Sequence, residues 1–547
     1  MMKVNIVDIQ EKTIYAAELE ITGCNIARIE KTGGEDPQLP YAMPGFTDAH
    51  VHIESSMLTP AQFARLAVVH GTVATVSDPH EIANVLGLPG VDFMVEDGKR
   101  IPFKFCFGAP SCVPATAFET AGATIDAAQV GALLAKPEIG YLAEVMNFPG
   151  VLNEDPDMMQ KIAWAKHYNK VIDGHAPGLR GDDAKKYAAN GISTDHECFT
   201  YEEAREKIDY GVKILIREGS AARNFDALIP LIAEFPQHIM FCSDDKHPDN
   251  LVEGHINVLV KRALSLGYDL WNVLSAACIN PVLHYSLPVG LLKSGDPADF
   301  ILVNNLTDFH ILETWINGEM VAKGGNTLIP DLRSAHPNHF ECSLKNAEEF
   351  GLPAESEREN ETEVRVIEVF DGQLITGELN ATVKVKGGQI SIDPDQDILK
   401  IAVVNRYSDS KPAVAFIKNF GLKTGAIASS VAHDSHNIIV VGTSDEAIAK
   451  AVNLIIAARG GVSAVGLGEE KLLALPIAGL MSDKDGYQVA AAYTEIDQFV
   501  KNKLESTLKS PFMSLSFMAL LVIPALKLSD KGLFDGKNFN FVPLSVR

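Results

Sequence analysis

Residues 44–56 read PGFTDAHVHIESS, and in this stretch a single residue separates His50 from His52. On a β-strand, side chains two positions apart project from the same face, so both imidazoles can reach one metal ion. The HxH pattern alone is equally compatible with two histidines that pack or are solvated at a strand end. The other histidine and acidic residues of the chain are needed to distinguish a metal site from a structural role.

Short apolar runs alternate with longer helix-like stretches over residues 44–286. This alternation is typical of parallel strands joined by helices, and about 250 residues is the usual size of a (β/α)8 barrel. Several runs end in ionisable residues, namely KVIDGHA (170–176), GISTDHE (191–197), VKILIREGS (212–220) and HIMFCSD (238–244). Because barrels carry their active sites at the carboxyl ends of the strands, we predict a TIM-like (β/α)8 barrel with its chemistry at these ends.

Strand-rich segments flank the predicted barrel. Residues 1–43 alternate like short strands and the pattern returns later, so we predict that 1–43 and 287–345 form one small composite β-domain. The charged stretch 346–362 is predicted to be a linker. Residues 363–547 combine strand-like runs with a helical stretch, which predicts an additional C-terminal α+β domain. The expected fold class is therefore α/β, a barrel with two accessory domains.

Six histidine and acidic residues at the predicted strand ends form a candidate metal site. They are His50, His52, Glu144, His175, His196 and Asp244. Neutral imidazoles and carboxylates are suitable ligands for Zn, Mn or Fe, and a carboxylate that bridges two cations can hold them a few ångströms apart. The order HxH, Glu, His, His, Asp favours a metal site over packed or solvated side chains.

In this order of ligands the sequence resembles the amidohydrolase superfamily. Its members carry HxH after the first barrel strand, a bridging residue on the fourth, histidines on the fifth and sixth, and an aspartate on the eighth. The usual bridging residue is a carboxylated lysine, whereas Glu144 stands at the corresponding place here. Further segments resemble the adenine deaminases of this superfamily, namely SDPHEIANVLG (77–87), EVMNFPGV (144–151), IREGSAARN (216–224), CSDDKHPDNLVEGHI (242–256), GLKTGAIASSVAHDSHNIIVVG (421–442) and LPIAGLMSD (475–483).

The resemblance implies a hydrolytic deamination of adenine to hypoxanthine and ammonia, a reaction of purine salvage, by water that a metal activates. It implies two divalent metal ions, manganese or iron, with zinc also compatible because all ligands are nitrogen or oxygen. In the superfamily the metal-binding aspartate follows a small hydroxylated residue, here Ser243, so Asp244 is expected to be both ligand and general base. For the neighbouring Asp245, spacing leaves a supporting role beside the metal site and a helix cap open.

Other residues near the strand ends are expected to contact the substrate. Glu218 is expected to hydrogen-bond or protonate the purine ring, although pairing with Arg217 or capping of the next helix would explain it equally well. His80 and Glu81 form another strand-end cluster that resembles the family's pattern, and a helix cap in the same segment is the alternative.

The remaining predicted substrate-binding residues are Asp245, His247 and Ser220. In the last predicted domain, the sequence HDSH (433–436) crowds a loop before a strongly apolar strand. This loop is expected either to lie over the barrel mouth or to form an ordinary polar turn.

Composition narrows the classes of partner. The net charge of −24 leaves no basic surface for a phosphate backbone, so nucleic acid is excluded as an expected partner, and adenine and water remain. Seven cysteines without CxxC spacing, no signal peptide and no apolar run long enough for a bilayer predict a cytoplasmic protein without a membrane partner. We also expect a homo-oligomer, with a dimer favoured.

Three other functions are the alternatives to adenine deamination. Zinc deaminases that act on nucleosides or nucleic acids carry HxE with a distant PCxxC, and although residues 52–54 match HxE, no PCxxC exists in this sequence. Another amidohydrolase that opens a cyclic amide or removes an acyl group stays open, because a metal site does not specify the bond that is broken. A catalytically inactive, metal-dependent purine-binding protein stays open as well.

Overall fold

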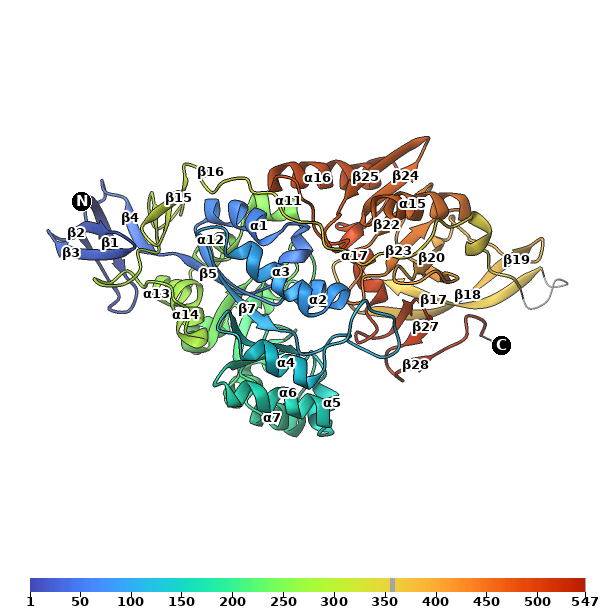
Figure 1. Cartoon of the computed structure of the whole chain (residues 1–547), viewed down its shortest axis with the longest axis horizontal. Helices are drawn as coiled ribbons and strands as arrows, with labels where there is room; N and C mark the ends of the chain where they lie inside the picture. The colour runs from blue at the N-terminus through green and yellow to red at the C-terminus, as the bar shows by residue number, and fades with distance from the viewer. Residues whose placement is uncertain (355–359, 547) are drawn as a thin grey trace.

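The computed structural model describes residues 1–354 and 360–546. A small sheet at the N-terminus, a central barrel and a large C-terminal sheet follow one another along the long axis of the molecule, with the two chain ends at opposite ends (Figure 1). The predicted barrel with a small β-domain and a C-terminal α+β domain is confirmed as the fold class.

Eight parallel strands form the barrel, and consecutive strands in the chain are neighbours in space. They are β5 (Phe46–Val51), β6 (Thr72–Ser77), β7 (Lys104–Ala109), β8 (Ile139–Val145), β9 (Val171–Gly174), β10 (Thr194–Asp195), β11 (Lys213–Arg217) and β12 (Ile239–Cys242). A bridge between Ile172 and Ile192 joins β9 to β10, and a bridge between Val51 and Asp244 joins β12 back to β5. Because these two bridges close the circle, the carboxyl ends of all eight strands meet at one rim.

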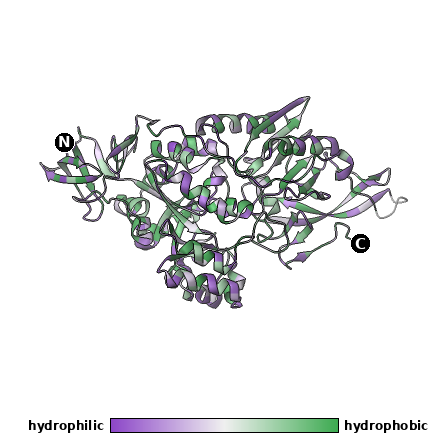
Figure 2. Cartoon of the chain, in the orientation of Figure 1, coloured by the Kyte–Doolittle hydropathy of each residue, from purple (hydrophilic) through white to green (hydrophobic). Residues whose placement is uncertain are grey.

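Helices surround the barrel strands. They are α1 (Pro60–Ala67), α2 (His80–Leu86), α3 (Leu88–Gly98), α4 (Ala127–Leu134), α5 (Phe148–Leu152), α6 (Pro156–His167), α7 (Gly181–Ala189), α8 (Tyr201–Asp209), α9 (Phe225–Leu228), α10 (Leu231–Glu234), α11 (Pro248–Glu253), α12 (Ile256–Ser265), α13 (Leu270–Leu274) and α14 (Asn280–Tyr285). Hydrophilic and hydrophobic residues are mixed along these helices, whereas the barrel strands are largely hydrophobic (Figure 2). Strands covered by helices on the outside and filled with side chains on the inside need apolar residues on both faces.

Local capping explains where several of these helices begin. Asp155 accepts a hydrogen bond from the backbone N–H of Met158 at 3.0 Å, and Pro156 occupies the first helical position of α6. Thr200 caps α8 in the same way, through the N–H of Glu203 at 3.2 Å. Such caps satisfy backbone donors that a helix leaves free at its start. Among the described residues, no helix is both long and apolar enough to cross a bilayer.

The N-terminal sheet is built from two distant parts of the chain. Its strand order is β16-β15-β14-β13-β4-β1-β2-β3. The strands are β1 (Met2–Asp8), β2 (Thr13–Thr22), β3 (Asn25–Lys31), β4 (Tyr41–Pro44), β13 (Phe300–Val303), β14 (Ile311–Ile316), β15 (Glu319–Lys323) and β16 (Asn326–Thr327). The two parts join where β4 pairs with β13, with Met43 opposite Ile301.

A nine-stranded sheet dominates the C-terminal part, in the order β19-β18-β17-β21-β20-β23-β22-β24-β25. Its strands are β17 (Glu361–Val369), β18 (Thr376–Lys386), β19 (Gln389–Ile390), β20 (Ile398–Val404), β21 (Ala413–Lys418), β22 (Ala426–Ser429), β23 (Ile438–Gly442), β24 (Gly461–Gly466) and β25 (Glu469–Ala474). Three helices and a small sheet complete this part, namely α15 (Asp445–Ala458), α16 (Gly486–Asn502), α17 (Pro511–Ser516), β26 (Leu526–Ser529), β27 (Gly532–Asp535) and β28 (Asn540–Phe541).

The segment predicted to be a linker, 346–362, is only partly described, because residues 355–359 lie outside the described residues. Its first part forms a short 3-10 turn, Ala347–Phe350. Phe350 is fully buried in an apolar cluster with residues of β20, β22 and β23. This part of the segment therefore packs onto the C-terminal sheet.

Candidate active site

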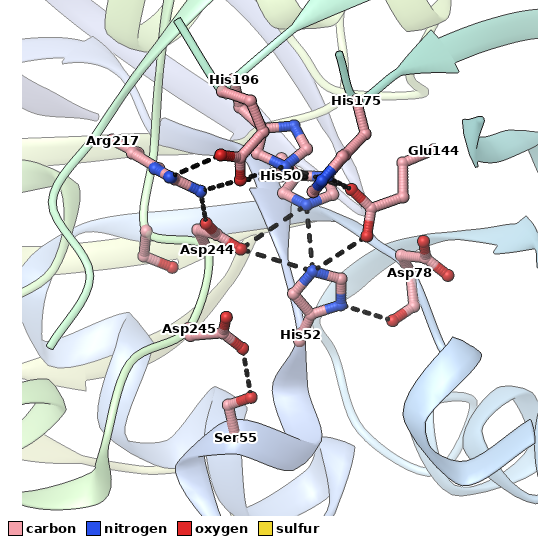
Figure 3. A network of polar contacts seen from close by, with 12 residues as sticks. His50, His52, Ser55, Asp78, Glu144, His175, His196, Arg217, Asp244 and Asp245 are labelled. Carbon is pink, nitrogen blue, oxygen red and sulfur yellow. Dashed lines mark hydrogen bonds and ion pairs between the residues drawn. The ribbon is translucent and has the colours of Figure 1, made fainter. Parts of the chain in front are cut away.

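The carboxyl rim of the barrel gathers six histidine and acidic side chains, of which His175 is partly exposed and the other five are buried (Figure 3). His50 lies on β5 and Glu144 on β8, while His52, His175, His196 and Asp244 come directly or within two residues after β5, β9, β10 and β12. Strands that run in parallel bring their ends to the same side, which is why residues so far apart in the sequence meet here. All six predicted metal ligands lie in this one cluster.

His50, His52 and Asp244 form one side of the cluster. The Nε2 atoms of the two histidines face each other at 3.1 Å. The Oδ1 atom of Asp244 lies 3.3 Å from Nε2 of His52 and 3.8 Å from Nε2 of His50. Two imidazole nitrogens that face each other beside a carboxylate oxygen are a donor set that suits a divalent cation.

Glu144 joins this group to a second one. Its Oε2 atom lies 2.8 Å from Nδ1 of His175 and 3.1 Å from Nε2 of His196, while its Oε1 atom lies 3.5 Å from Nε2 of His52. Each carboxylate oxygen therefore faces a different set of imidazoles. This arrangement fits two cations that share one bridging carboxylate, with nitrogen and oxygen donors only.

Arg217 supports Asp244 from the far side. Its guanidinium group donates to Oδ2 of Asp244, and it also holds both oxygens of Glu197, one of them at 2.9 Å. Burial alone would raise the pKa of Asp244, but the charge of Arg217 and the imidazole of His52 hold this pKa well below its usual range. Asp244 is therefore kept as a carboxylate beside the histidines.

Asp245 has a different environment from its neighbour. The Ser55 hydroxyl donates to its Oδ1 atom at 2.5 Å (Figure 3). Burial and the charge of Asp244 raise the pKa of Asp245 above its ordinary value. Two adjacent carboxyl groups thus differ in their tendency to hold a proton.

A buried network below the cluster fixes the turn that carries Asp244. Asp48 accepts hydrogen bonds from the backbone N–H of Ser243 at 3.0 Å and from its hydroxyl at 2.5 Å. A third partner is Nε2 of His255, at 2.8 Å from the same carboxylate. Asp244 itself has a φ of +52°, a left-handed conformation that is uncommon for a residue other than glycine. The Asp48 network therefore holds a costly backbone conformation in place.

A narrow cavity opens onto the cluster, and the centre of a water molecule can occupy about 30 Å³ of it. Its barrel side is lined by His52, His80, Glu81, Glu144, Met146, His175, His196, Glu197, Arg217, Asp244 and Asp245. Its other side comes from the C-terminal domain, through Leu374, His433, Asp434, Phe517, Leu520 and Ile523. We call these six residues the cap. They give the cavity one polar wall and one mainly apolar wall.

The loop 433–436 belongs to this cap, and hydrogen bonds tie it to the barrel. Nδ1 of His433 lies 2.5 Å from Oε1 of Glu81, and Nε2 of His436 contacts the other oxygen of Glu81. The ring of His433 also stacks on Phe517 at a centroid distance of 4.4 Å. The loop therefore lies over the barrel mouth, which is one of the two placements expected from the sequence.

His80 lies between the metal-ligand cluster and the cap. Its Nδ1 atom is 3.0 Å from Oδ2 of Asp78 and 3.4 Å from Oε1 of Glu144. Its Nε2 atom lies 3.4 Å from Glu81 and 3.9 Å from Oδ1 of Asp434. His80, Glu81 and Asp245, all predicted to contact substrate, thus line the cavity.

Three of the residues predicted to act on or bind the substrate do not line this cavity. Glu218 pairs with Arg262 at 3.0 Å and with Arg223 at 3.9 Å, not with Arg217, because the chain turns away from the rim after β11. The structure thus gives no support to a contact between Glu218 and the purine ring, which stays a prediction.

Ser220 and His247 stabilise the loop behind the cavity. The hydroxyl of Ser220 donates to Oδ1 of Asn250 at 2.7 Å and accepts from the backbone N–H of His247 at 2.8 Å. The ring of His247 packs edge-on against Tyr493, and burial lowers its pKa to about 3. Both residues stabilise the loop, and their direct contact with the substrate stays a prediction.

Two charged residues on the barrel side of the cavity, Arg217 and Glu197, were not predicted as site residues. Each carries a sequence signal: Arg217 directly follows the apolar run ILI (214–216), and Glu197 directly follows a predicted ligand. A charge at such a buried position requires a partner, and the two residues partner each other.

Comparison with known proteins places the chain in a family. Residues 41–321 match the model of the amidohydrolase family, which is metal-dependent, and residues 373–540 match the adenine deaminase C-terminal domain. The adenine deaminase of Sulfurovum sp. (strain NBC37-1) is 58% identical over 541 residues, covering 99% of both chains. That of Salinibacter ruber (strain DSM 13855 / M31) is 54% identical, covering 98% of this chain and 97% of its own. The chain belongs to the amidohydrolase family and, within it, to the adenine deaminases.

Proposed function

We propose that the chain hydrolyses adenine at C6, so that water replaces the amino group and hypoxanthine and ammonia leave. The observation that carries the proposal is the convergence of four histidines and Asp244 around Glu144 at the polar wall of a cavity. The membership in the adenine deaminases supports the choice of substrate.

Two divalent cations fit the donor set that is present. His50, His52 and Asp244 would hold one of them, His175 and His196 the other, and Glu144 would contact both. When bound, such cations lower the pKa of water towards neutrality and so supply a nucleophile. The all-nitrogen and oxygen donors suit manganese or iron, and also zinc.

The protein's own carboxyl groups would move the protons. Asp244, held as a carboxylate by Arg217, would accept a proton from the attacking water at Oδ1 and pass it to the departing amine. Asp245 lines the cavity beside it and would give a proton to ring nitrogen N1, which must be protonated as water adds to C6. In this proposal Asp245 takes the role expected of Glu218.

The cap would exclude bulk water and hold the flat ring. Leu374, Phe517, Leu520 and Ile523 present apolar surface opposite the ligand cluster. A purine can bury its faces against such side chains while its C6 edge meets the polar wall. Removing water also strengthens each electrostatic contact in the cavity.

An ammonia-release assay on the metal-loaded protein tests the proposal. Adenine, a hydantoin, dihydroorotate and an N-acetylated sugar would be assayed separately, with ammonia measured for adenine and the ring-opened or deacetylated product measured by chromatography for the other three. Adenine is expected to be the only one of the four that is converted. Turnover of only a non-adenine compound would overturn it in favour of another amidohydrolase activity. Binding of adenine without turnover in both the wild type and Asp244→Asn would instead identify a purine-binding protein.

Metal content gives a second, independent readout. The purified protein is expected to bind two equivalents of divalent metal, and Glu144→Gln is expected to lose at least one of them because the shared ligand is gone. Full metal content in Glu144→Gln would contradict the bridging role. A homo-oligomer, with a dimer favoured, and a cytoplasmic location stay predictions, and light scattering of the purified protein tests the first.

A further inference from the structure

Two polar atoms of cavity-lining side chains have no hydrogen-bond partner among the described residues. They are Nε of Arg217, on the barrel side, and Oδ2 of Asp434, in the cap. Both side chains are almost fully buried, with Asp434 only 3% exposed. A buried acceptor without a partner is costly, and at the wall of a cavity it is a position where a ligand donor gains a strong contact.

Asp434 lies away from the metal-ligand cluster. Its other oxygen, Oδ1, is 3.9 Å from Nε2 of His80, whereas the opposite ring nitrogen of His80 faces Oε1 of Glu144 at 3.4 Å. The imidazole of His80 thus separates Glu144 from Asp434 along the cavity. A flat molecule that lies beside His80 would have one end at the cluster and the other end at Asp434.

The chemistry of adenine fixes which end lies where. Its C6 atom must meet the water that attacks, so the six-membered ring faces the cluster. The five-membered ring then extends to the cap, and in the free base its N9 atom carries a hydrogen. The four apolar members of the cap offer this N–H no acceptor, and His433 is occupied by Glu81 through Nδ1.

We infer that Asp434 is the residue that selects a free purine base, by accepting a hydrogen bond from the N9–H of adenine at Oδ2. The inference rests on the proposed deamination and adds a determinant of specificity to it. A nucleoside or a 9-alkyl purine has carbon instead of hydrogen on N9. Such a compound would leave the aspartate without a partner and would press its substituent against the cap.

Substituting Asp434 tests the inference when two substrates are compared. In Asp434→Ala, kcat/KM for adenine is expected to fall roughly 10- to 100-fold because a charge-assisted hydrogen bond is lost. For 9-methyladenine, which never made this bond, kcat/KM is expected to stay the same or to rise. The ratio between the two substrates should therefore fall at least about tenfold. Asp434→Asn keeps the shape and one acceptor oxygen, and it should give an intermediate ratio.

The ratio separates selection from a general structural role. A variant that only disturbs folding or the ligand cluster lowers kcat/KM for both substrates by the same factor. An unchanged ratio of the two kcat/KM values in both Asp434 variants would therefore overturn the inference. Asp409→Ala is the matched control, because Asp409 is an aspartate of the same domain that pairs with Lys345 outside the cavity. This control is expected to keep the wild-type ratio.

Equilibrium binding gives a readout that does not need turnover. Calorimetry with hypoxanthine and 9-methylhypoxanthine should show a strong preference for the former in the wild type and a loss of this preference in Asp434→Ala. Equal affinities in the wild type would overturn the inference while leaving the proposed reaction intact. A wild-type protein that releases no ammonia from adenine would instead overturn the proposed function itself.

Discussion

Glu81 of barrel helix α2 and His433 of the C-terminal domain share a hydrogen bond of 2.5 Å across 352 residues of sequence. Both side chains are almost fully buried at the edge of the cavity. Burial alone would lower the pKa of His433, but the carboxylates of Glu81 and Asp245 raise it to about 9. The contact is therefore a buried ion pair at neutral pH, and it joins the barrel to the cap.

Replacing Glu81 should weaken this junction. Glu81→Gln leaves a buried imidazolium without its carboxylate, and breaking a buried pair in this way costs about 3–5 kcal/mol. Urea unfolding should show the loss as a lower midpoint. Glu96→Gln is the control, because Glu96 pairs with Lys99 on the surface and its loss should cost less than about 1 kcal/mol. Equal midpoints for the two variants would contradict the importance of the junction.

Arg217 should be essential for turnover. Arg217→Met removes the cation that holds Glu197 and Asp244, and kcat is expected to fall about 100-fold or more. Arg217→Lys should recover only part of the rate, because an ammonium group cannot bind Glu197 and Asp244 in the planar geometry of a guanidinium group. Arg262→Met is the control, since Arg262 pairs with Glu218 outside the cavity, and it should stay within about threefold of the wild type. Comparable losses at both positions would refute the assignment.

Two carboxyl groups compete for the role of proton donor to the ring. Asp245→Asn should reduce ammonia release about 100-fold or more while the metal content is kept. Glu218→Gln should change the rate by less than about threefold, because Glu218 is held by Arg262 away from the cavity. If Glu218→Gln were slow and Asp245→Asn were active, Glu218 and not Asp245 would be the proton donor to the ring.

Lys527 should make stability depend on pH. Burial lowers its pKa to about 7, and its Nζ atom donates to the backbone oxygens of Leu374 at 2.8 Å and Phe517 at 2.9 Å, two members of the cap. Because the folded-state pKa lies below that of the unfolded chain, the stability that Lys527 contributes is present above about pH 10.5 and is lost as the pH falls towards 7.

Urea unfolding from pH 7 to 10 checks this dependence. The free energy of unfolding of the wild type should rise relative to that of Lys527→Met over this range, by an amount on the order of a few kcal/mol. The control is Lys411→Met, at an exposed lysine of the same domain, and its difference from the wild type should not vary with pH. Parallel pH curves for the wild type and Lys527→Met would disprove the effect.

The barrel and the convergence of the six candidate ligands could be predicted because their signals are local. Each of these residues ends or follows an apolar run, and the rule that strand ends meet at one rim brings them together without knowledge of distant contacts. The position of Glu218 outside the cavity also has a local reason. Strand β11 ends at Arg217, and the alternation of strand side chains directs Arg217 to the cavity while the next residue turns outwards.

The position of the loop 433–436 over the barrel mouth could be predicted only as one of two alternatives. A loop such as HDSH (433–436) carries no local signal for the barrel residue it will contact, and the bond from His433 to Glu81 depends on how two large sheets pack. The same holds for Asp434, whose unpartnered oxygen is visible only when every neighbouring atom is placed. Long-range packing therefore determines the part of the site that the sequence left open.

The pairing of β4 with β13 has a consequence for synthesis of the chain. The ribosome releases residues 41–44 long before residues 300–303. Strand β4 therefore cannot pair with β13 until the whole barrel sequence has emerged. In that interval one edge of the N-terminal sheet offers free backbone groups to other nascent chains. Completion of the barrel and closure of this edge are thus one late event in the biogenesis of the protein.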